Sequence, residues 1–92
     1  MIVAIRLSIV GRVQGVGFRA FVAWQAQSNG LRGWVRNRGD GSVEALLIGE
    51  GDAIEVVITR CGRGPALARV DRLLRHPAED DGTQDFIQRS TV

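Results

Sequence analysis

Hydrophobic and polar residues alternate at the start of the chain. Ile5, Leu7 and Ile9 fall on one side of an extended backbone, and Arg6 lies between them on the other. A period of two is typical of a strand that packs one face against a core. The pattern predicts a strand over residues 2–10.

The spacing becomes helical after a glycine-rich stretch. Phe18, Val22 and Ala26 follow one another at intervals of four, which places them on one face of a helix. The pair Asn29-Gly30 that follows is typical of a helix C-terminus. The sequence therefore predicts a helix that begins at Phe18 and ends at Asn29.

Two more strands are predicted around a tight turn. Residues 31–38 alternate again, with Val35 and Asn37 on the same face. Residues 39–41 read Gly-Asp-Gly, a sequence suited to a sharp reversal, and residues 42–48 resume the alternation. This arrangement predicts an antiparallel hairpin.

The segment 52–61 fits both a strand and a helix, because its apolar residues satisfy either spacing. The flanking residues favour the helix. Asp52 followed three residues later by Glu55 resembles a capping box, and Gly62 and Gly64-Pro65 are typical of a helix end. We therefore expect a second helix here.

The remaining segments complete a recognisable order. Residues 69–76 predict a fourth strand, residues 80–82 a turn, and residues 86–89 a short last strand. A strand, helix, strand order that occurs twice predicts an α+β fold, a ferredoxin-like split βαβ sandwich. Its mostly antiparallel sheet would hold four to five strands, with two helices on one face. We expect a single domain over residues 1–92.

Composition narrows the class of protein. The chain has 92 residues, 45% of them hydrophobic, and a formal charge of +2, with arginine as its only strongly basic residue type. The lone Cys61 excludes an internal disulfide and a cysteine metal cluster, and favours a reducing compartment. No apolar stretch approaches the roughly 20 residues that span a bilayer. We expect a cytoplasmic protein without a signal peptide, metal, cofactor or membrane partner.

The glycine-rich stretch before the first helix is the candidate binding loop. Gly11, Gly15 and Gly17 allow sharp turns, so that consecutive backbone amides can converge on an anion at the positive end of the helix. Arg19 in the first helical turn is unfavourable there unless an anion binds beside it. Gln14 either supports the loop or is an ordinary solvated turn residue. The sequence predicts a bound phosphate or carboxylate.

A dinucleotide site is the competing interpretation of this loop. Residues 15–20 also fit the pattern G-x-G-x-x-A between a strand and a helix. That fold needs an acidic residue at the end of its second strand, where this chain has Asn37. The tight turn after this strand also leaves no room for a crossover helix, so we disfavour a dinucleotide.

Two motifs follow each other along the chain. The first is IVGRVQGVGFR, from Ile9 to Arg19, and the second is GWVRNRGDGSVEALLIG, from Gly33 to Gly49. In their order and spacing they resemble the two signatures of the acylphosphatase family. The resemblance extends over about residues 2–74. It implies the ferredoxin-like fold and hydrolysis of a carboxyl-phosphate anhydride to a carboxylate and inorganic phosphate, without a metal or a phosphoenzyme.

The resemblance also implies roles for individual residues. Arg19 matches the arginine that holds the phosphoryl group, and Asn37 matches the asparagine that positions the attacking water. The implied phosphate loop consists of the backbone amides of Gly15, Val16, Gly17, Phe18 and Arg19. The partners would be a small acyl phosphate and inorganic phosphate, the latter as product and inhibitor, with no nucleic acid. We expect a monomer.

Two other functions compete with this hypothesis. One is a non-catalytic or accessory acylphosphatase-like module that handles carbamoyl phosphate, as found at the start of large hydrogenase-maturation proteins. The other is a ferredoxin-like RNA-binding domain, although Trp34 alone does not supply the paired exposed aromatics that such a sheet uses.

The end of the chain departs from the acylphosphatase pattern. The family's last strand usually reads Phe-Glu-Ile-Arg, whereas this chain has Phe86-Ile87-Gln88-Arg89. The exchange sends Ile87 to the outer face and Gln88 inward, unless a bulge corrects the register. The last strand could therefore be short, shifted or frayed.

Overall fold

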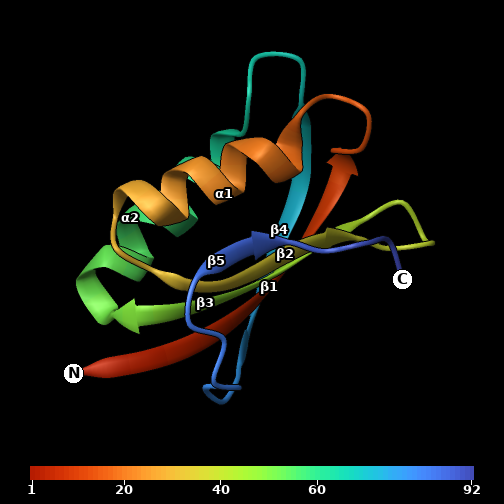
Figure 1. Ribbon diagram of the computed structural model, residues 1–92. Helices are drawn as coiled ribbons and strands as arrows, with labels where there is room; N and C mark the ends of the chain where they lie inside the picture. The colour runs from red at the N-terminus through yellow and green to blue at the C-terminus, as the bar shows by residue number, and fades with distance from the viewer.

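The structure is a computed structural model that describes residues 1–92. Two helices lie side by side on one face of a five-stranded sheet (Figure 1). The elements are β1 (Ile2–Arg12), α1 (Phe18–Ser28), β2 (Arg32–Asn37), β3 (Val43–Glu50), α2 (Gly51–Arg63), β4 (Arg69–Pro77) and β5 (Phe86–Gln88). The strand order is β4-β1-β3-β2-β5, and only the β2–β5 pair is parallel. The predicted α+β, ferredoxin-like sandwich is confirmed.

The first strand is longer than its alternation predicts. It continues past a register shift between Val10 and Gly11, where it pairs with β4. Gly11 has a φ of 142°, and a β-carbon there would lie 2.1 Å from the carbonyl oxygen of Arg69. The bulge breaks the period of two without ending the strand, so the pattern alone places the end of β1 too early.

The expected capping box of the second helix is wrong. The helix begins at Gly51, its N-cap is Glu50, and no side chain caps it by a hydrogen bond. Glu55 instead pairs with Arg75 of β4, and this contact lowers the pKa of the carboxyl group. Asp52 lies in the first turn, where a carboxylate interacts favourably with the helix dipole.

Neither helix has the length and apolarity needed to cross a membrane.

One hydrophobic core of 17 buried residues fills the space between the helices and the sheet. Its largest members include Phe18 at the start of α1, and Leu7 and Leu47 on the central strands. Each such side chain contributes about 1.5–3 kcal/mol when it is removed from water. The core therefore holds the N-terminal end of α1 firmly against the sheet.

Close packing between β2 and β3 depends on Gly33. A β-carbon at this position would lie 1.9 Å from the carbonyl oxygen of Leu46, and the residue has a φ of 129°. A Gly33→Ala substitution is expected to lower the free energy of unfolding by about 2–4 kcal/mol, because strain and overpacking add. Urea denaturation followed by circular dichroism measures this change.

Gly62→Ala is the matched control, because a β-carbon at this helical position meets nothing within 4 Å. Alanine there should stabilise α2 by up to about 1 kcal/mol. Equal stability of the Gly33→Ala variant and the wild type would contradict the close approach of the two strands.

Candidate active site

The loop between β1 and α1 is built on two glycines in the left-handed region. Gly15 has a φ of 73° and Gly17 a φ of 79°, and a β-carbon on either would meet nothing within 4 Å. Glycine is thus needed for the backbone conformation rather than for space. Val13 and Phe18, each 1% exposed, anchor the two ends of the loop in the core.

The backbone amides of this loop are free to bind a ligand. In α1 the first hydrogen-bonded amide is that of Phe21, which donates to the carbonyl oxygen of Gly17 at 3.0 Å. No side chain caps the helix, and no acidic residue lies in its first turn. Unpaired amides and the positive end of the helix dipole therefore face the same point, a typical arrangement for binding an anion.

A hollow of about 210 Å³ joins this loop to the ends of β2 and β5. Its lining consists of Val13, Gly15, Gly17, Phe18, Arg19, Ala20, Asn37 and Gln88. The structure thus brings together Arg19 and Asn37, which lie 18 positions apart in sequence. Val16 is the one candidate residue outside the lining, because its side chain packs against the core.

The polar side chains in the hollow have no partners within the protein. Arg19 forms no ion pair, and no carboxylate lines the hollow. The side chains of Asn37 and Gln88 form no hydrogen bond, although other glutamines such as Gln14 do. One unpaired cation and two unpaired carboxamides therefore surround a space lined by free amides.

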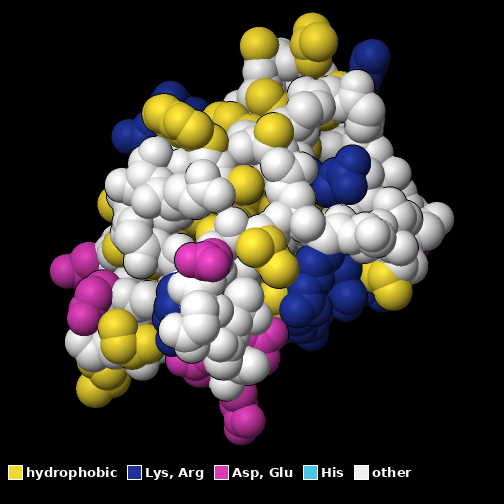
Figure 2. Space-filling view, in the orientation of Figure 1, with side chains coloured by type: hydrophobic (Ala, Val, Ile, Leu, Met, Phe, Trp, Pro, Cys, Tyr) yellow, Lys and Arg dark blue, Asp and Glu magenta, His cyan; other side chains and the backbone are white.

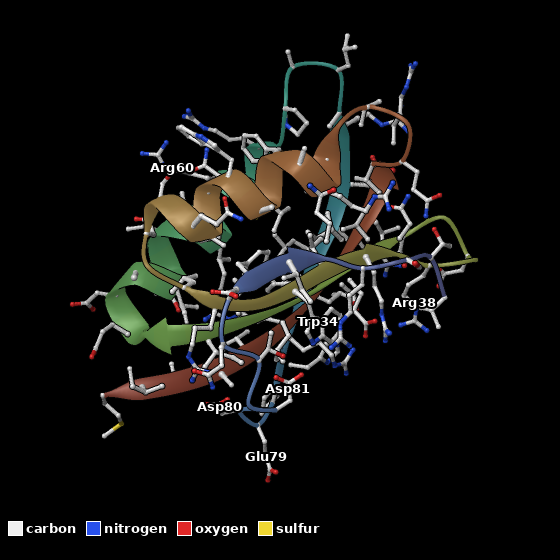
Figure 3. All side chains as sticks on the ribbon, in the orientation of Figure 1. Trp34, Arg38, Arg60, Glu79, Asp80 and Asp81 are labelled. Atoms are coloured by element: carbon white, nitrogen blue, oxygen red, sulfur yellow. The ribbon has the colours of Figure 1, made fainter.

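Contacts on the face of β2 that points away from the helices direct Asn37 toward the hollow. On the opposite face of the sheet, the guanidinium of Arg36 lies 4.6 Å from the ring centroid of Trp34. Arg36 also donates from Nε to Oε1 of Glu44 at 2.8 Å. Figure 3 shows Trp34 on this side, away from the helices, and Figure 2 shows arginine side chains gathered there. The stacked and paired groups on this face hold the strand so that the next side chain, Asn37, points inward.

Gln14 ties the loop to the β2–β3 turn. Its Nε2 donates to the carbonyl oxygens of Arg38 at 2.8 Å and Ser42 at 2.9 Å. The sequence leaves the role of Gln14 open, and the structure shows that it supports the loop. The two hydrogen bonds connect the elements that carry Arg19 and Asn37.

The match to known families follows this geometry. The family model "Acylphosphatase" matches residues 5–87. An acylphosphatase of Rhodopseudomonas palustris (strain BisB18) is 54% identical over 76 residues, which is 83% of this chain and 77% of the relative. The chain belongs to the acylphosphatase family. It is accordingly a hydrolase of acyl phosphates.

Solved structures agree with the family assignment. The acylphosphatase from Bacillus subtilis is 34% identical, with a TM-score of 0.91 over 97% of this chain and 99% of that one. HypF from T. kodakarensis is also 34% identical, with a TM-score of 0.85. This match covers 100% of the present chain and 12% of HypF. The acylphosphatase fold therefore occurs both alone and inside a larger protein.

Other reactive side chains lie outside the acylphosphatase hollow. Cys61 is buried in the core, and burial raises the pKa of its thiol to about 12. His76 lies on β4, where it pairs with Arg6 of β1. No group of three or more His, Cys, Asp and Glu side chains is placed to hold a metal ion.

The last strand keeps a regular register. Phe86, Ile87 and Gln88 pair with Gly33, Trp34 and Val35 without a bulge. The expected exchange of faces follows from this register: Phe86 is buried, Ile87 is 41% exposed on the other face, and Gln88, although also exposed, lines the hollow. The sequence places Gln88 inward but assigns it no function, because the end of β5 meets the loop only in the folded chain.

Proposed function

We propose that this chain hydrolyses small acyl phosphates by direct attack of water on phosphorus, in the hollow between the β1–α1 loop and the end of β2. One observation carries the proposal. An arginine without an acidic partner, free amides at a helix N-terminus and an unpaired asparagine line the same space. Phosphoryl transfer requires mainly such positioning and charge stabilisation.

Arg19 and the loop amides of residues 15–19 bind the phosphoryl group in this proposal. The guanidinium stays charged at any working pH, and its fork matches two phosphoryl oxygens. The amides and the helix dipole neutralise further charge where it develops in the transition state. A cation in the first helical turn is repelled by the helix dipole, and the placement of Arg19 there becomes favourable when the phosphoryl group lies between the cation and the amides.

Asn37 orients the attacking water. Its carboxamide oxygen accepts a hydrogen bond from water, and its amide group donates one to a phosphoryl oxygen. As the water oxygen bonds to phosphorus, the bond from phosphorus to the acyl oxygen breaks and its electron pair leaves on the carboxylate. A water proton passes to a phosphoryl oxygen. Because a carboxylate is a good leaving group, the step needs no acidic side chain.

Further properties follow from the proposal. The reaction proceeds without a metal, and inorganic phosphate inhibits it competitively because it occupies the same loop. We expect residues 1–92 to act as one domain and as a monomer in the cytoplasm, without a nucleic-acid partner. Trp34 supports the last point, because it is only 7% exposed and Arg36 and Arg89 cover its ring.

The test is hydrolysis of acetyl phosphate by the purified chain in the presence of a metal chelator. We expect phosphate release far above the spontaneous rate, with competitive inhibition by inorganic phosphate. Release at the spontaneous rate, or release that requires an added metal ion, would contradict the proposal. Indifference to inorganic phosphate would contradict the loop as the binding site.

A second function is favoured by the match to HypF. The chain would then be a non-catalytic or accessory module that handles carbamoyl phosphate, and its fold matches one part of the larger HypF chain. Comparing kcat/KM for carbamoyl phosphate and acetyl phosphate distinguishes the two. A general acylphosphatase uses both at similar rates, whereas a dedicated module uses only the first or neither.

A further inference from the structure

We infer that Gln88 is a second carboxamide that holds the attacking water, together with Asn37; this inference rests on the proposed hydrolysis. Gln88 lines the hollow that contains Arg19 and Asn37. Gln88 is exposed, and its side chain forms no hydrogen bond within the protein, so both its donor and its acceptor are available to a bound water.

The sheet register brings the two carboxamides to the same side. Gln88 pairs with Val35 across the parallel β2–β5 ladder, and Asn37 lies two positions farther along β2 on the same face. With neighbouring strands about 4.8 Å apart and a rise of about 3.3 Å per residue, such diagonal neighbours are roughly 8 Å apart, within reach of a long side chain. Both carboxamides can therefore approach one water molecule from neighbouring strands.

In-line chemistry assigns this side to the nucleophile. Water attacks phosphorus on the side opposite the departing acyl oxygen. If Asn37 orients the water, a carboxamide beside Asn37 lies on the water's side rather than on that of the leaving group. Gln88 thus supplies a hydrogen bond that Asn37 alone cannot, since a water molecule can accept and donate several at once.

The backbone around Gln88 is fixed before any ligand binds. Phe86 is buried, and its carbonyl oxygen accepts a hydrogen bond from Gln27 of α1 at 3.1 Å. The amide of Arg89 donates to the carbonyl oxygen of Val35 at 2.8 Å, and the guanidinium of Arg89 lies 5.3 Å from the ring centroid of Trp34. Anchors on both sides of Gln88 hold the backbone of β5 in place, so that this exposed side chain starts from a fixed position at the edge of the hollow.

A Gln88→Leu variant tests the inference, because leucine keeps an apolar stem but removes the carboxamide. We expect kcat for acetyl phosphate to fall about 3–10-fold, the effect of one neutral hydrogen bond. KM and the inhibition constant of inorganic phosphate should stay within twofold of wild type. The matched control is Ile87→Gln, which places a carboxamide on the other face of the same strand and should leave kcat unchanged.

Orthovanadate separates a role in the transition state from a structural one. In its five-coordinate form an apical oxygen stands where the attacking water would be, so Gln88→Leu should weaken vanadate inhibition several-fold while phosphate inhibition is unchanged. The double variant Asn37→Ala/Gln88→Leu should lose less activity than the product of the two single losses, since both groups hold one water.

The outcomes distinguish this inference from the proposed function. An active wild type with an equally active and vanadate-sensitive Gln88→Leu variant overturns the role of Gln88 alone. Multiplicative losses in the double variant overturn the shared water. A wild type without activity on any acyl phosphate overturns the proposed function and this inference with it.

Discussion

An Arg19→Ala variant is expected to hydrolyse acetyl phosphate with a kcat/KM about a hundredfold to a thousandfold below wild type. The substitution removes the only charged side chain that lines the hollow. Both substrate binding and transition-state stabilisation weaken, because the guanidinium interacts with phosphoryl oxygens throughout the reaction. KM should therefore rise and kcat fall in steady-state assays of phosphate release.

Two further variants make the Arg19 experiment specific. Arg19→Lys keeps the charge but loses the two-pronged geometry, so it should recover only part of the activity. Arg60 also has no acidic partner, but it lies on α2, outside the hollow. The Arg60→Ala variant should therefore have the activity of the wild type. An Arg19→Ala variant that binds inorganic phosphate as tightly as wild type would exclude Arg19 from the phosphate site.

Asn37→Ala is expected to lower kcat about a hundredfold or more, with little change in KM or in phosphate inhibition. The asparagine orients the nucleophile and contributes less to ground-state binding, so its loss acts mainly on turnover. Steady-state kinetics with acetyl phosphate and inorganic phosphate measure the two effects separately.

Asn29→Ala is the control for removing an asparagine. Asn29 donates from Nδ2 to the carbonyl oxygen of Gln25 at 2.8 Å at the end of α1, so its loss should affect stability rather than turnover. Wild-type turnover in Asn37→Ala would refute the water-orienting role. Loss of folding, checked by circular dichroism, would instead place Asn37 among the structural residues.

The fold could be predicted because its signals are local. The alternation of Ile5, Leu7 and Ile9, and the four-residue spacing from Phe18 to Ala26, follow directly from which faces meet the core. The sequence also allowed the prediction that Arg19 and Asn37 lie close together. The loop glycines mark one end of the site, and the strand face that carries Val35 also carries Asn37.

Features that depend on distant segments could not be predicted. Glu55 was expected to cap its own helix, but Arg75 of β4, 20 positions away, offers it a charged partner. Whether Gln14 is a solvated turn residue or supports the loop depends on two carbonyl oxygens in the segment after β2, to which its side chain donates. Nothing local indicates that Gln88 would meet the phosphate loop, because that contact requires β5 to pair with β2 in parallel.

Isotope labelling tests most directly the claim that water attacks phosphorus in this hollow. Wild-type protein should hydrolyse acetyl phosphate in water enriched in oxygen-18, and mass spectrometry should then locate the label in the two products. We expect the label in inorganic phosphate and none in acetate, since the bond from phosphorus to the acyl oxygen is the one that breaks. Label in acetate would mean attack at the carbonyl carbon and would contradict the roles proposed for Arg19 and Asn37.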